Sequence, residues 1–124
     1  LKRLNQWMTY GQRTQNHRPE ALVQAAAEDA AYPYPMPAYA YKAQCAACLS
    51  HDTAARLSEI QAPTLVAAGA KDLFMNMEKT MELAQGIPGA ELYLSPEGGH
   101  VHQWEYPDAY NSAVLGFLQK HDLR

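Results

Sequence analysis

The run Thr64-Leu65-Val66-Ala67-Ala68 is apolar on both of the faces that alternate along an extended chain, and Gly69 ends it. Such a run is typical of a strand that is buried on both sides, as strands are in a parallel sheet covered by helices. A second strand-sized run, residues 90–94, follows further along the chain. Together the two runs predict neighbouring strands of one parallel sheet.

A helix is predicted after each strand. Asn76 can cap a helix that ends near Gly86, because its side chain can accept a hydrogen bond from a free N–H of the first turn. Pro107 opens a last helix with one apolar stripe, made of Tyr110, Ala113, Val114, Phe117 and Leu118. The order strand, helix, strand, helix predicts an α/β fold.

Two parallel strands do not make a complete sheet. A strand that is apolar on both faces needs strands at both edges and helices on both faces, and isolated two-stranded sheets are marginally stable. The sequence therefore predicts the end of a larger sheet. The chain also begins at Leu1 and not at Met, which agrees with a piece of a longer protein.

Residues 1–53 have no strand pattern. Glu20 to Ala31 is rich in alanine and follows Pro19, which suits the first position of a helix. Three alternate prolines between Tyr32 and Pro37 exclude a helix and predict an extended link. A second helix is expected over Ala38–Ser50, so the chain divides near residue 53.

Composition excludes several classes of function. The 124 residues are 48% apolar and 19% charged with a net charge of −3, so we expect a globular domain and neither a nucleic-acid nor a membrane partner. Lys2 and Arg3 precede polar residues and not a signal peptide's apolar stretch. A start without a signal-peptide pattern, together with only two cysteines, favours a reducing, cytoplasmic location.

The two cysteines, Cys45 and Cys48, have the spacing C-A-A-C. A structural zinc site needs four ligands, and a thioredoxin-type motif opens a helix just after a strand. We therefore interpret the pair as two small, buried residues on one helix face. The histidines show no ligand spacing either, so we expect no metal and no other cofactor.

Asp72 and His100 are the candidate chemical groups. Each follows the carboxyl end of a predicted strand, where sites form in open α/β sheets. A lone aspartate after a strand is often only a turn residue, but the joint placement favours function. The carboxylate would accept the Nδ1 proton of His100 and leave Nε2 free as a general base. Gly98 and Gly99 allow the tight turn that presents the ring.

Several stretches resemble the α/β-hydrolase fold. Residues 57–72 look like its acid strand and loop, and residues 87–92 with Gly98-Gly99-His100 look like its last strand and histidine loop. Glu105-Tyr106-Pro107 and the helix behind it look like the final helix. The resemblance covers about residues 54–121. It implies the C-terminal part of an α/β-hydrolase-like parallel sheet in residues 54–124, with a helical cap-like segment in residues 1–53.

Residues 35–52 are similar to the last cap helix of small-molecule esterases, enol-lactonases and aminoacrylate-hydrolase-like members. The resemblance implies Asp72 as the acid and His100 as the base of a triad, with an upstream nucleophile that is usually Ser in G-x-S-x-G. None of the four serines has glycine on both sides at that spacing, and neither cysteine replaces them; the serines are Ser50, Ser58, Ser95 and Ser112.

The resemblance implies hydrolysis of a small-molecule ester, lactone, amide or related acyl substrate. The partner would be the N-terminal half of the same core, or a self-associated copy of the chain. Two alternatives stay open: a non-catalytic binding or self-association module, and a haloperoxidase or cofactor-free oxygenase with this fold.

Other side chains rank lower as functional candidates. His102 could point into the site or lie in the loop, and we favour the loop. Trp104 and Glu105 are expected to support the histidine loop, with Trp104 in packing contacts and not in contact with substrate. Asp52 is interpreted as a cap for the turn that follows it, and not as half of a dyad with His51. Three apolar side chains could line the mouth of a pocket or the sheet surface, but we favour core positions for them: Phe74, Met75 and Met77.

Overall fold

The computed structural model describes residues 8–122. Leu1, Lys2 and Arg3, on which two of the expectations above depend, lie outside this range. The helices and strands are, in chain order, α2 (Gln12–His17), α3 (Pro19–Ala31), α4 (Ala38–Ser50), η1 (Ala54–Glu59), β1 (Leu65–Gly69), α5 (Met77–Gly86), β2 (Glu91–Ser95), α6 (His102–Glu105) and α7 (Pro107–Lys120).

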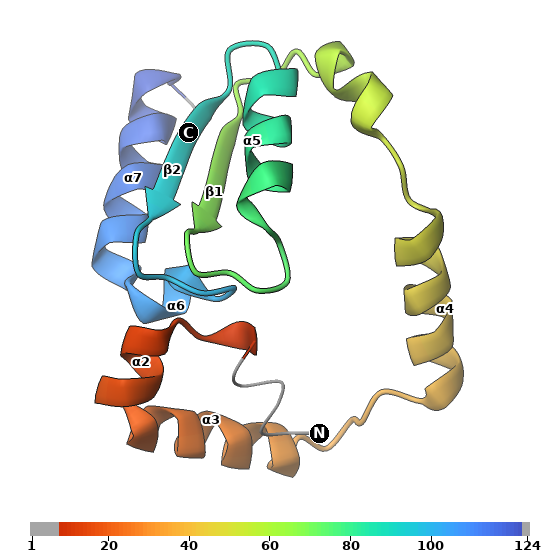
Figure 1. The fold of residues 1–124 in the computed structure, drawn as a ribbon, viewed down its shortest axis with the longest axis vertical. Coiled ribbons are helices and arrows are strands. Elements are labelled where there is room, and N and C mark those ends of the chain that lie inside the picture. Colours follow the sequence, from red (N-terminus) through yellow and green to blue (C-terminus); the bar gives the residue numbers. More distant parts are fainter. Residues whose placement is uncertain (1–7, 123–124) are drawn as a thin grey trace.

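The two strands pair in parallel, which confirms the predicted sheet. Their register runs from Leu65 opposite Glu91 to Gly69 opposite Ser95. In Figure 1, α5 lies beside β1 and α7 beside β2, and a ring contact of 6.2 Å between Tyr93 and Tyr110 joins β2 to α7. Both strands therefore end at one edge of the sheet, where the following loops meet.

Local signals in the sequence account for the helix boundaries. Asn76 caps α5 by accepting a hydrogen bond of 2.9 Å from the N–H of Lys79. Proline occupies the start of α3 and of α7, where its missing N–H costs nothing. The predicted bounds of α4 and α5 are confirmed, and each strand is shifted by one residue from its prediction.

The prediction that the first strand is buried on both faces is only partly right. In β1 only Ala68 and Gly69 are buried, and in β2 the side chains of Leu92 and Leu94 are exposed. Among residues 8–122 the sheet has two strands, so each strand has one edge without a hydrogen-bonded strand beside it.

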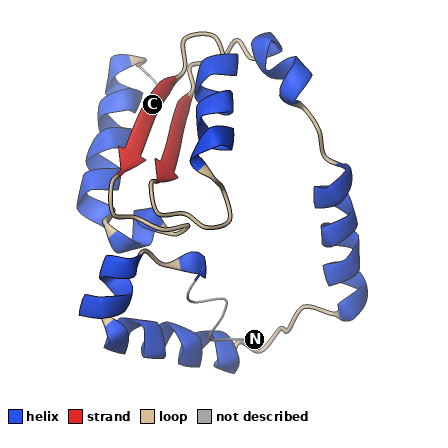
Figure 2. Cartoon of the chain, in the orientation of Figure 1, coloured by secondary structure: helices blue, strands red, loops and turns tan. Residues whose placement is uncertain are grey.

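The burial expected for the cysteines is wrong. The helix α4 has no buried residue; Cys48 is exposed and Cys45 is partly exposed. The physical reason is visible in Figure 2, where α4 stands away from the sheet on extended links. Because no residue of α4 is buried, neither cysteine lies on a face that is packed against another described element.

Close packing joins the loops at the carboxyl ends of the strands. A Cβ atom added to Gly69 would overlap the carbonyl oxygens of Gly98 and Gly99. Glycine at position 69 therefore lets the end of β1 lie directly against the loop that follows β2. Within residues 8–122 no helix has the length and apolar character that a membrane span needs.

We expect Gly69→Ala to lower the free energy of unfolding by about 1–3 kcal/mol, because the new methyl group has no space and would force the two loops apart. Gly116→Ala is the control: this helical glycine faces open space, so alanine should stabilise the protein by up to about 1 kcal/mol. Urea unfolding of the two variants measures both effects. Equal stability of Gly69→Ala and the parent protein would contradict the close packing.

Candidate active site

Asp72 lies just beyond β1, with its side chain 6% exposed. Its Oδ1 accepts hydrogen bonds from the N–H groups of Phe74, at 2.7 Å, and Met75, at 3.0 Å. The aspartate thus makes a local turn with its own backbone, a common conformation of this residue type. The two N–H donors fix the plane of the carboxylate and leave Oδ2 facing the neighbouring loop.

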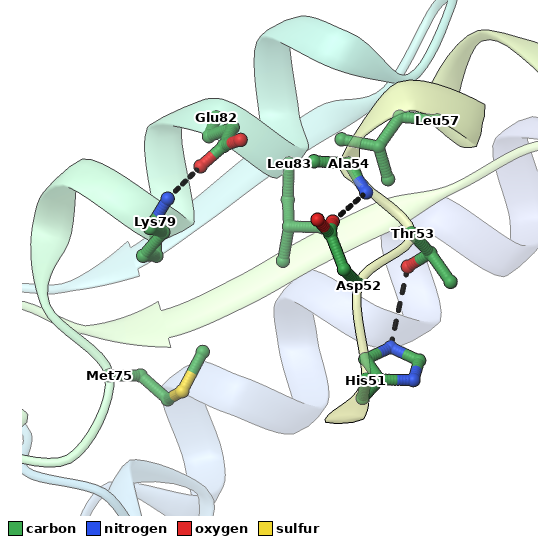
Figure 3. A pocket seen from close by; sticks show the side chains of 9 residues that line it. All are labelled: His51, Asp52, Thr53, Ala54, Leu57, Met75, Lys79, Glu82 and Leu83. Atoms are coloured by element: carbon green, nitrogen blue, oxygen red, sulfur yellow. Dashed lines mark hydrogen bonds and ion pairs between the residues drawn. The ribbon is translucent and has the colours of Figure 1, made fainter. Parts of the chain in front are cut away.

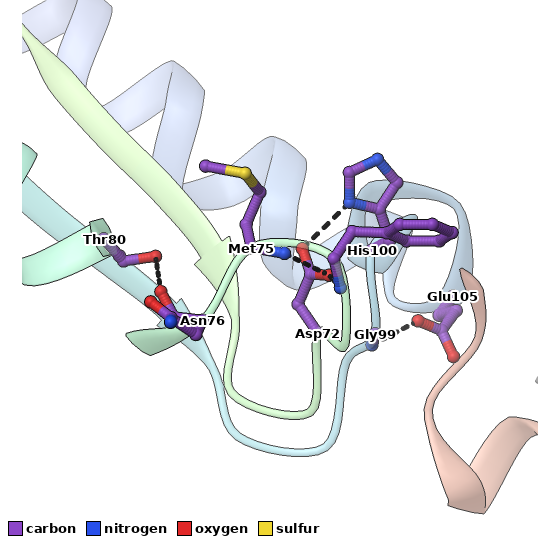
Figure 4. A network of polar contacts seen from close by, with 8 residues as sticks. Asp72, Met75, Asn76, Thr80, Gly99, His100 and Glu105 are labelled. Carbon is purple, nitrogen blue, oxygen red and sulfur yellow. Dashed lines mark hydrogen bonds and ion pairs between the residues drawn. The ribbon is translucent and has the colours of Figure 1, made fainter. Parts of the chain in front are cut away.

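His100 lies in the loop after β2, and its side chain is 45% exposed. Its Nδ1 is 2.9 Å from Oδ2 of Asp72 (Figure 4). The ring of Phe74 packs at 5.0 Å from the imidazole ring, on the side of the acid loop. The two residues that the sequence singled out are therefore in direct contact, although 28 positions separate them.

Backbone hydrogen bonds hold the acid loop against the histidine loop. The N–H of Ala70 donates to the carbonyl of Ser95 at 2.8 Å, and that of Lys71 donates to the carbonyl of Gly98 at 2.9 Å. These bonds continue the ladder between β1 and β2 past the end of the strands. The contact between the acid and the imidazole is thus built on main-chain geometry.

Glu105 supports the histidine loop, as the sequence predicts. It is 3% exposed, and its Oε2 accepts a hydrogen bond of 2.6 Å from the N–H of Gly99 (Figure 4). Its Oε1 accepts a second bond, of 2.8 Å, from the N–H of Gly11. Sequence reasoning missed Gly11, because 94 positions separate it from Glu105 and no local pattern links them.

The segment from Thr9 to Arg18 docks on the same loop. The N–H of Val101 donates to the carbonyl of Thr9, and the guanidinium of Arg18 donates to the carbonyl of Glu105. Arg18 also lies over the ring of Trp104, at 5.3 Å from its centroid. Trp104 thus makes the packing contact that was expected, while remaining partly exposed.

The expectation for His102 is wrong. The residue opens α6 and is 7% exposed, with its ring between Tyr93 of β2 and Tyr110 of α7 at 6.3 and 5.6 Å. Both ring nitrogens are buried without a hydrogen bond to the described residues. The short helix begins directly after Val101, and this turns the ring toward the inside of the domain.

Among the remaining expectations, those for Asp52 and His51 are confirmed and those for two apolar residues are wrong. Asp52 caps the following turn, as predicted, by accepting the N–H of Ala54 at 3.1 Å. His51 lies 3.3 Å from the hydroxyl of Thr53, so the pair is no dyad. Core placement is wrong for Phe74 and for Met75, which are exposed because they follow the acid loop to the surface.

A cavity of about 370 Å³ lies between η1 and α5 (Figure 3). Its lining is His51, Asp52, Thr53, Ala54, Leu57, Met75, Lys79, Glu82 and Leu83. Met75 connects it to the acid loop, but neither Asp72 nor His100 lines it. The cavity is therefore separate from the candidate pair.

No group of three or more His, Cys, Asp or Glu side chains in the described part of the chain is placed to hold a metal ion. Ser95 ends β2 and is buried, with its side chain against the backbone of Gly98. The site thus contains an acid and an imidazole.

No family model matches the chain. A curated relative, 2-hydroxy-6-oxononadienedioate/2-hydroxy-6-oxononatrienedioate hydrolase of Klebsiella pneumoniae, is 44% identical over 69 residues. These residues are 56% of this chain and 24% of that protein. The matched residues thus span about a quarter of the length of that curated relative.

Solved structures match more of the chain. An N-acyl homoserine lactone degrading enzyme is 35% identical, with a TM-score of 0.72 over 89% of this chain and 43% of its own. The enol-lactonase of Burkholderia xenovorans LB400 has a TM-score of 0.80 over 95% of this chain and 44% of its own. At 23% identity the second likeness concerns the fold alone. Both confirm the predicted α/β fold class.

We expect the buried His102 to make stability depend on pH. Burial lowers the pKa of His102 below its ordinary 6.5; the backbone of Gly99 and the carboxylates of Asp72 and Glu105 oppose this, and His100 adds to it. The unfolded chain therefore takes up this proton before the folded one does. The contribution of the neutral His102 to the free energy of unfolding is therefore fully present above about pH 6.5. It decreases as the pH drops from there toward the lowered pKa.

His102→Phe keeps an aromatic ring between the two tyrosines and removes the titration. Its free energy of unfolding should therefore fall less than that of the parent between pH 7 and pH 5. His17→Phe, at an exposed position of α2, is the matched control and should follow the parent. Parallel pH curves for the parent and His102→Phe would contradict the buried, neutral imidazole.

Proposed function

We propose that this chain, whose fold is that of the α/β-hydrolases over the part it covers, supplies the acid and base of a hydrolytic triad. One observation carries the proposal: Oδ2 of Asp72 lies 2.9 Å from Nδ1 of His100. The carboxylate is almost fully buried and the imidazole is half exposed, so the free face of the ring is open to a reactant.

The proposed mechanism follows from this geometry. Asp72 holds the Nδ1–H tautomer of His100 and stabilises the imidazolium when it forms. Nε2 then takes the proton of a nucleophile as that nucleophile attacks a carbonyl carbon, and later delivers it to the leaving group. We propose that the nucleophile lies on a further segment of the sheet, because no serine of this chain has the nucleophile motif.

The substrate class is proposed from the relatives. One relative is named for a 2-hydroxy-6-oxo dienedioate and another for an N-acyl homoserine lactone. Both names describe small molecules with a carbonyl carbon that a nucleophile can attack. We therefore propose a small ester, lactone, amide or related acyl compound as the substrate.

The helices of residues 1–53 would act as part of a cap. The segment Thr9–Arg18 already rests on the histidine loop, and α4 carries exposed aromatic side chains. A cap of this kind closes over a substrate and excludes water from the reaction.

The function is tested by His100→Ala and Asp72→Asn in the full-length protein. We expect the turnover of small activated esters to fall about 10³-fold or more in each variant, because each removes one member of the triad. His17→Ala, which replaces an exposed histidine of α2, is the control and should keep full turnover. Near-native turnover by His100→Ala would contradict the assignment of the base.

A second proposal concerns the open edge of the sheet. Within residues 8–122 β1 pairs only with β2, so its other edge has no strand beside it. We propose that further strands of a hydrolase core cover this edge. A non-catalytic module would instead cover it with a second copy of the chain.

Sedimentation velocity on the isolated 124-residue chain tests the open edge. We expect concentration-dependent association, because an uncovered strand pairs readily with another chain. Co-expression with the N-terminal half of a hydrolase core should suppress that association. A well-folded, stable monomer at every concentration would contradict the need for a partner at β1.

A further inference from the structure

Glu105 carries a carboxylate that is almost fully buried from solvent. Taking a carboxylate out of water costs several kcal/mol unless hydrogen bonds replace the lost water. Two backbone N–H groups do so here: Gly99 donates to Oε2 and Gly11 donates to Oε1. An ionised carboxylate only accepts hydrogen bonds, so each of its oxygens suits one of these donors.

The first of these bonds acts next to the candidate base. Gly99 directly precedes His100, and a Cβ atom at Gly99 would press on the backbone of Thr9, Tyr10 and Gly11. The peptide is thus held between the carboxylate and the chain of the N-terminal segment. Moving Gly99 would move the backbone from which the imidazole of His100 projects.

The residue after the base is held as well. The N–H of Val101 donates to the carbonyl of Thr9 at 3.3 Å. Hydrogen bonds therefore connect both neighbours of His100 to the segment from Thr9 to Gly11. Gly99 is connected through the carboxylate of Glu105, and Val101 is connected directly. This segment leads directly into α2 and α3, so the same bonds connect the base to the proposed cap.

We propose that Glu105 is a positioning residue for the base, which it holds through Gly99 and couples to the cap-like helices through Gly11. The proposal rests on the proposed function, because it gives Glu105 a role toward His100. It adds a residue outside the triad whose charge sets the geometry of the triad. A misplacement of about 1 Å at a reacting group can cost about 10²-fold in rate.

Glu105→Gln in the full-length protein tests the role in catalysis. The amide has one donor group, which would face one of the two N–H donors, so one bond is lost with little change of shape. We expect kcat for small esters to fall about 10²-fold with little change in KM, and the pH profile of kcat/KM to shift. Glu97→Gln, exposed on the same loop, is the matched control and should match the parent.

A role in stability alone has a different signature. It predicts that Glu105→Gln, at a temperature where it is folded, keeps the parent's kcat and pH profile, and that result would overturn the proposal. If the variant fails to fold, Glu105→Asp retains the charge on a shorter side chain. It should restore the fold with a reduced kcat; full activity of Glu105→Asp would also overturn the proposal.

Amide hydrogen exchange in the unmodified protein tests the coupling separately. The N–H groups of Gly99 and Gly11 share one carboxylate, so we expect both to be protected and to open with the same free energy. Rapid exchange of the Gly99 amide would overturn the coupling, whatever the activity. Absence of His100-dependent hydrolysis, in contrast, would refute the proposed function, while the exchange result still decides whether the coupling exists.

Discussion

The close approach of two loops at one edge of the sheet is the constraint on which the site depends. Parallel pairing brings the ends of β1 and β2 to the same edge, and Gly69 allows the loop after β2 to lie directly on the end of β1. Only then can a carboxylate and an imidazole that are 28 positions apart meet at 2.9 Å. The chemistry proposed for Asp72 and His100 is thus a consequence of backbone packing.

Much of the fold could be predicted because its signals are local. Proline opens α3 and α7, and Asn76 caps α5, so these boundaries depend on a few neighbouring residues. Burial could not be predicted in the same way. Residues 64–68 have the pattern of a buried strand, but in β1 only Ala68 and Gly69 are buried, because burial depends on what packs against a face.

The candidate site, like the fold, contains residues that local signals predict and residues that they do not. Asp72 and His100 could be predicted, since strand ends can be read from the sequence and parallel strands share an edge. The bond from Gly11 to Glu105 could not, because it joins distant segments with no pattern between them. His102 was misplaced because its neighbours look like a loop, whereas α6 starts at that residue and carries its ring into the domain.

The central claim is that Asp72 fixes His100 as a base whose Nε2 is free. The ¹⁵N NMR spectrum of the imidazole tests it most directly, because the two ring nitrogens differ in chemical shift when only one carries the proton. At a pH where His100 is neutral, we expect the proton on Nδ1, and its redistribution toward Nε2 in Asp72→Asn. A proton on Nε2 in the parent protein, unchanged by Asp72→Asn, would contradict the account.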